Sequence, residues 1–144
     1  MTGEEIRANK ATVTRVLKAY AQGDLAPLFE AIADDVEWTS NTVSENYRFG
    51  GRRTGRAGVL EALSLIAVDY AVRRYELKEV TAEGDTIWSY VDAEFMHRRT
   101  NKPIAFVLAS RWKFRDGKIV AFEEFFDTAA VLEQEGRITK IAAQ

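Results

Sequence analysis

Glu124 is the residue of this sequence best suited to transfer a proton. It lies between Phe122 and Phe126 in an alternating run, on a face that we predict to be apolar. Burial disfavours the charged form of a carboxyl group and raises its pKa, which suits a general acid or base near neutral pH. The alternative to this buried position is that Glu124 pairs with an arginine or faces solvent.

Other residues that could do chemistry have simpler interpretations. His97, the single histidine, falls near a predicted hairpin tip, where a surface position is expected. Asp127 precedes a helical run and is placed to cap it. Tyr47 and the arginines of the polar segment 40–54 could close over a ligand or simply lie at the surface.

Neither a metal ion nor a cofactor is expected. The chain has no cysteine and one histidine, so thiolate sites are excluded and a zinc site held by protein ligands alone is not expected. No glycine-rich nucleotide loop or Walker pattern is present in the sequence.

Two alternating segments must place Glu124. In residues 104–115 the bulkier side chains recur at every second position and form the predicted inner face: Ile104, Phe106, Leu108, Ser110, Trp112 and Phe114. A three-residue turn at 115–117 is the preferred connection, because it puts a bulky set on that face: Val120, Phe122, Glu124 and Phe126. A two-residue turn would instead put the other set there: Ala121, Glu123, Phe125 and Asp127.

The segment before these two also has distinct faces. A four-residue turn at 99–102 turns its more apolar set inward: Ile87, Ser89, Val91, Ala93, Phe95 and His97. The outer face carries Trp88, Tyr90 and Met96 among charged residues. Such a face is either an interface or an ordinary surface with scattered aromatic side chains.

Helices precede the strands along the chain. A capping box at Thr2 and Glu5 starts a helix that ends near residue 22, and a short helix follows Asp24. Next come a short strand at 36–39, a polar loop at 40–54 that could act as a lid, and a helix at 55–68. Four long antiparallel strands then run from 71 to 127. This order indicates an α+β fold, with the helices covering one face of the sheet.

Length and charge restrict the protein further. A chain of 144 residues is the size of one domain, and we take 1–135 as its core and 136–144 as a C-terminal tail. A net charge of −2 argues against nucleic-acid binding. No apolar span and no leader is recognised, so a cytoplasmic protein without membrane contact is expected.

Five segments together resemble the SnoaL-like branch of the nuclear transport factor 2-like superfamily, which includes polyketide cyclases and ketosteroid isomerases. They are Ala21–Leu25, Ala33–Val36, Thr54–Arg56, Trp112–Ile119 and Phe122–Asp127. The resemblance implies a cone-shaped fold, in which N-terminal helices and a curved, mainly antiparallel sheet enclose a pocket. It also implies a homodimer through the outer sheet face, anchored by Trp88, Tyr90 and Met96.

The resemblance carries a catalytic role to one residue only. Glu124 stands where SnoaL-like cyclases and limonene epoxide hydrolases have a catalytic aspartate. Ketosteroid isomerases have two acids where this sequence has Trp38 and Ser110, and a tyrosine where it has Val16. These replacements argue against 3-ketosteroid chemistry. Val91, Ala93, Trp38 and Ser40 likewise replace the other catalytic groups of the epoxide hydrolases. Trp38 is instead expected in the pocket wall, with its indole N–H free for one hydrogen bond.

Two functions from different classes therefore remain open. The first is a cofactor-free lyase, isomerase or cyclase that uses Glu124 as general acid or base on an apolar, cyclic or polyketide-like compound. The second is a non-catalytic domain that binds a small hydrophobic ligand. Both use the same predicted ligand-binding residues: Trp38, Ser40, Phe95, Phe106, Leu108, Ser110, Trp112, Phe122 and Phe126.

Overall fold

Helices come first and long strands follow, as the sequence predicts. A computed structural model describes residues 1–138, so the end of the predicted tail, 139–144, lies outside the described residues. The elements, in chain order, are α1 (Gly3–Ala21), α2 (Ala26–Ala31), β1 (Ile32–Ser40), β2 (Gly51–Thr54), α3 (Gly55–Asp69), β3 (Tyr70–Glu83), β4 (Thr86–His97), β5 (Lys102–Arg115), β6 (Lys118–Phe125) and α4 (Thr128–Gln134). None of the helices within 1–138 is both long and apolar enough to cross a membrane.

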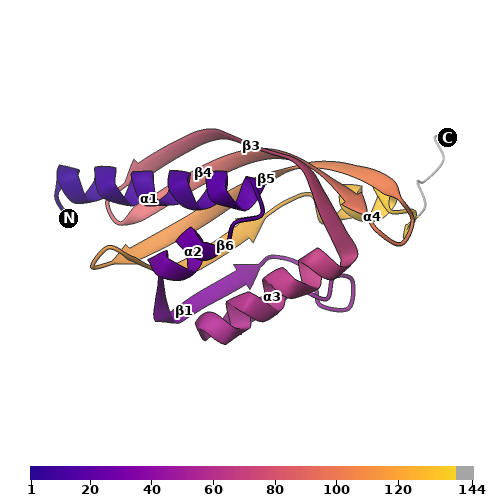
Figure 1. The fold of residues 1–144 in the computed structure, drawn as a ribbon, viewed down its shortest axis with the longest axis horizontal. Coiled ribbons are helices and arrows are strands. Elements are labelled where there is room, and N and C mark those ends of the chain that lie inside the picture. Colours follow the sequence, from indigo (N-terminus) through magenta and orange to yellow (C-terminus); the bar gives the residue numbers. More distant parts are fainter. Residues whose placement is uncertain (139–144) are drawn as a thin grey trace.

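All six strands form one sheet, in the order β2-β1-β6-β5-β4-β3. Only β1 and β6 pair in parallel, and every other neighbouring pair is antiparallel. Helix α1 packs on β3 and β4, α3 packs on β1, and α4 packs on β5 (Figure 1). The predicted α+β class, with helices on a mainly antiparallel sheet, is confirmed.

Short polar side chains fix where several helices begin. The Thr2 hydroxyl accepts a hydrogen bond from the Glu5 amide at 3.0 Å, and Asp127 Oδ1 accepts one from the Ala130 amide at 2.9 Å. These two predicted caps are therefore confirmed, whereas Thr54, the cap expected for the helix at 55–68, forms no side-chain cap hydrogen bond. Helix α2 ends at Ala31, because the buried Ile32 already pairs with Ile119 of β6. Strand β1 is correspondingly longer than the predicted 36–39.

The connection from β5 to β6 differs from the prediction, although Glu124 still faces inward. The turn has two residues, Asp116 and Gly117, both with positive φ (51° and 77°), as a tight hairpin requires. The preferred three-residue turn is therefore wrong. A bulge at Val120 then shifts the register by one residue and returns Phe122 and Glu124 to the inner face.

The connection from β4 to β5 preserves the predicted faces. Its turn covers residues 98–101 instead of 99–102, and His97 pairs with Lys102. Every inner residue predicted on β4 is buried. The outer face of the sheet exposes large apolar side chains, each between 39% and 43% accessible: Trp88, Tyr90, Val107 and Phe125.

Candidate functional site

The helices and the sheet enclose an apolar cavity. The cavity has a volume of about 90 Å³. Glu124 lines it together with most of the predicted ligand-binding residues: Trp38, Phe95, Phe106, Leu108, Trp112, Phe122 and Phe126. The predicted Ser40 and Ser110 do not line it, although both are buried beside Glu124 on the neighbouring strands. Of the described residues that line the cavity, Glu124 is the only one that can carry a charge near neutral pH.

Glu124 is held on a central strand, with Ser110 of β5 opposite it on one side and Ser40 of β1 on the other. Its side chain is half-buried, and the accessible part faces the cavity. Burial raises the pKa of the carboxyl group from 4.5 to about 7, and the nearby Ser40 hydroxyl opposes this rise only in part. No hydrogen bond of ordinary length and angle joins the Ser40 hydroxyl to any group within residues 1–138.

No arginine or lysine within residues 1–138 forms an ion pair with Glu124. The salt-bridged interpretation is therefore wrong for the described residues, and so is the solvent-facing one. What remains is a carboxyl group in apolar surroundings, with a pKa close to neutral pH.

Aromatic rings build the cavity wall beside Glu124. Trp38 stacks on Phe122, with ring centroids 3.9 Å apart, and Trp112 contacts Phe122 edge-on at 4.7 Å. The indole N–H of Trp112 donates to Ser89 at 3.0 Å. The indole N–H of Trp38 has no partner within residues 1–138.

Two tyrosines that sequence reasoning missed lie close enough to Glu124 for its charge to affect their pKa values. Tyr20 comes from α1 and Tyr75 from β3, and their rings meet edge-on at 4.9 Å. Burial, and then the charge of Glu124, raises the pKa of Tyr20 to about 12. Burial, Tyr20 and Glu124 together raise the pKa of Tyr75 as well. Both hydroxyls therefore keep their protons at neutral pH, and neither has a hydrogen-bond partner within residues 1–138.

The predicted loop 40–54 supplies part of the cavity wall and a short strand, β2. Tyr47 and Phe49 are buried and line the cavity. The Tyr47 hydroxyl donates to the main-chain oxygen of Thr128 at 2.8 Å, which fixes the loop to the start of α4. The expectation of a purely polar loop is thus wrong at Tyr47 and Phe49. Both rings pack against Phe126 and are shielded from water there.

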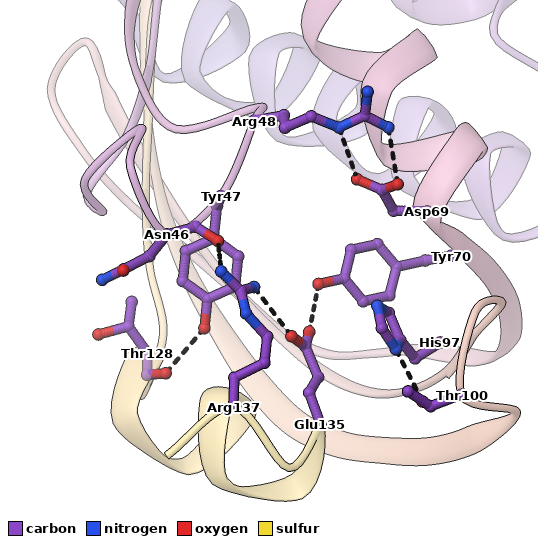
Figure 2. Close-up of polar contacts among 10 residues, drawn as sticks. All are labelled: Asn46, Tyr47, Arg48, Asp69, Tyr70, His97, Thr100, Thr128, Glu135 and Arg137. Atoms are coloured by element: carbon purple, nitrogen blue, oxygen red, sulfur yellow. Dashed lines mark hydrogen bonds and ion pairs between the residues drawn. The ribbon is translucent and has the colours of Figure 1, made fainter.

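A polar cluster lies next to this loop, and Figure 2 shows its hydrogen bonds. Glu135 is buried; it accepts a hydrogen bond from the Tyr70 hydroxyl and pairs with Arg137 at 3.0 Å. His97 is only 6% exposed, so its predicted surface position is wrong. The Tyr70 ring packs against it, and its Nδ1 lies 2.7 Å from the Thr100 hydroxyl.

Comparison with known proteins identifies the family. The model of the SnoaL-like domain matches residues 13–122, which is most of the chain. The protein belongs to the SnoaL-like domain family. No curated protein matches the sequence.

Solved structures agree with this assignment of a SnoaL-like domain. One is an NTF2-like protein of unknown function from Burkholderia pseudomallei K96243, with 25% identity, a TM-score of 0.81, and coverage of 88% of this chain and 96% of that one. Another is a putative isomerase from Rhodopseudomonas palustris, with 26% identity, a TM-score of 0.73, and coverage of 94% and 98%. TerC, crystallised with polyporic acid, shares the fold at 24% identity with a TM-score of 0.80, over 88% of this chain and 97% of its own.

Proposed function

We propose that this SnoaL-like protein is a cofactor-free acid–base enzyme of the isomerase, lyase or cyclase type. Its substrate is a small apolar molecule, cyclic or polyketide-like, that enters the cavity. One observation carries the proposal: the carboxyl group of Glu124, which has no ion-pair partner within residues 1–138, lines an apolar cavity and has a pKa of about 7. Structural carboxyl groups are seldom buried without a cationic partner, because burial of the charge costs folding free energy.

Glu124 can move a proton in either direction near neutral pH. At its pKa the charged and neutral forms are equally populated, so the carboxylate can remove a proton and the acid can return it. A carbon next to a carbonyl group is a suitable proton donor, since the resulting negative charge moves to the carbonyl oxygen. The surrounding rings of Trp38 and Phe122 exclude water and would hold the flat body of such a substrate.

Tyr20 and Tyr75 supply hydrogen-bond donors for that oxygen. Both hydroxyls are protonated at neutral pH, as tyrosines ordinarily are, and both are free of partners within residues 1–138. A donor that points at the developing negative charge stabilises the transition state. The putative isomerase from Rhodopseudomonas palustris, similar over nearly its whole length, supports chemistry of the proton-transfer kind.

Hydrogen exchange of a substrate-like ketone tests the proposal. The protein is incubated in D₂O near pH 7 with small cyclic ketones, such as 2-tetralone, and deuterium uptake next to the carbonyl is followed by NMR. Wild type should accelerate the uptake, and Glu124→Gln should lower that acceleration by about a hundredfold or more. Glu123→Gln is the matched control, because the neighbouring side chain lies on the other face of β6. If the ketones bind wild type and Glu124→Gln equally, and neither of these two accelerates deuterium uptake, the protein is a binding domain and not this kind of enzyme.

A further inference from the structure

A second, polar pocket adjoins the apolar cavity at the end of the sheet near the 98–101 turn. This pocket has a volume of about 250 Å³. Three aromatic side chains, Tyr47, Phe49 and Tyr70, line both spaces. The hydroxyls of the two tyrosines are fixed, to Thr128 and Glu135 respectively, whereas Phe49 has no polar anchor. Phe49 is held only by ring contacts with Tyr47, Tyr70 and Phe126, so we expect its ring to be the one that moves when a ligand connects the two spaces.

Most charges around the polar pocket are already neutralised. Arg48 forms two hydrogen bonds with Asp69, at 2.7 and 3.1 Å, and Arg137 pairs with Glu135 (Figure 2). Two charged lining residues have no ion-pair partner within residues 1–138: Arg99 and Glu45. Of the charges that residues 1–138 bring to the pocket, one cation and one anion are therefore left free for a ligand.

His97 adds an unpaired hydrogen-bonding group to the same pocket. The side chain is more than nine-tenths buried, and Nδ1 is taken by the Thr100 hydroxyl. Its Nε2 has no partner within residues 1–138, although His97 lines the pocket. When Nδ1 accepts a hydrogen bond from the Thr100 hydroxyl, Nε2 carries the ring proton and is a donor. Together with Arg99, it offers hydrogen-bond donors to a ligand in this pocket.

We propose that the polar pocket binds the carboxylate tail of an apolar, ring-bearing acid whose ring occupies the cavity. Arg99 attracts the carboxylate, His97 donates a hydrogen bond to it, and Glu45 limits its affinity. The proposal rests on the proposed function for the cavity, and it names the class of compound that the site takes: an aryl or polycyclic carboxylic acid.

Matched ligands and matched variants test this assignment. The probes are ω-phenylalkanoates of increasing chain length and their methyl esters, titrated by calorimetry into wild type, Arg99→Gln, Glu45→Gln and Arg111→Gln. Arg111 lies on the outer face of β5 and does not line the pocket, so its variant controls for the change in net charge. Arg99 and Glu45 are both exposed, so neither change should disturb folding.

The two pocket variants should have opposite effects. Arg99→Gln should weaken binding of the acids by about two- to fivefold, and Glu45→Gln should strengthen it by a similar factor. The esters, and the Arg111→Gln control, should show no such change, and one chain length should bind best because it spans both spaces. If acids and esters bind alike in every variant, the carboxylate pocket is wrong while the cavity stands. If neither acids nor esters bind wild type, the proposed cavity function is wrong as well.

Discussion

Replacing Glu124 by glutamine should stabilise the protein above neutral pH. The folded protein raises the pKa of this carboxyl group from 4.5 to about 7 by burying it. Since each pKa unit is worth about 1.4 kcal/mol, ionisation in the folded state costs roughly 3 kcal/mol relative to the unfolded chain. The amide of glutamine has a similar shape and no charge, so the variant avoids that cost.

The effect must depend on pH in a defined direction. Because the folded-state pKa lies above the unfolded one, the stability that protonated Glu124 contributes is complete below pH 4.5 and is lost as the pH rises through about 7. Glu124→Gln lacks this loss. It should match wild type within about 1 kcal/mol near pH 4.5 and exceed it by about 1 to 3 kcal/mol near pH 8. The lower value applies when water in the cavity solvates the carboxylate.

Urea unfolding at several pH values, followed by tryptophan fluorescence, measures this difference directly. The difference from wild type removes the pH dependence that all other groups contribute, and Glu123→Gln shows the effect of removing a neighbouring carboxyl group on the other face. A loss of about 3 kcal/mol near pH 8 in Glu124→Gln would refute the reasoning, because it would mean that the charge is paired in the folded protein.

Three further predictions concern the cavity wall, the loop and the outer sheet face. Trp38→Ala removes the ring stacked on Phe122 and should lower the free energy of unfolding by about 3 kcal/mol or more in urea titrations; a change below about 1 kcal/mol would show that the stack is not stabilising. If loop 41–50 is a lid, its amides should exchange faster than those of β5 and slow when a ligand binds, and equal protection would reject the lid. The exposed Trp88 and Tyr90 should anchor a homodimer, so Trp88→Lys should shift the protein to monomer in analytical ultracentrifugation. A wild type that is already monomeric at micromolar concentration would contradict this dimer.

The sequence predicted the central strands because their two-residue period is strong. Residues 104–114 alternate without interruption, and the structure buries the predicted set except for the half-buried Phe106. The inner position of Glu124 followed from this face, but by an incorrect route. The two-residue turn at 116–117 alone would have turned Glu124 outward, and the bulge at Val120 compensates for it. A single unpaired residue of this kind leaves no clear mark on the hydrophobic pattern.

The parts of the site that the sequence did not reveal depend on contacts between distant segments. Tyr75 lies on β3, whose alternation is interrupted by register shifts between Val72 and Arg74 and between Leu77 and Glu79. The burial of Tyr47 and Glu135 arises only when the loop, β3 and the end of α4 meet. No local period marks such residues, since their neighbours in sequence are polar.

The titration of Glu124 itself tests the central claim most directly. Wild type labelled with ¹³C at glutamate carboxyl carbons is followed by NMR from acidic to basic pH, and the Glu124→Gln spectrum identifies the resonance. A carboxyl carbon that titrates near pH 7 is the predicted result, because the apolar cavity disfavours the charge. Titration near pH 4.5, like that of an exposed glutamate, would contradict an acid–base role for this residue.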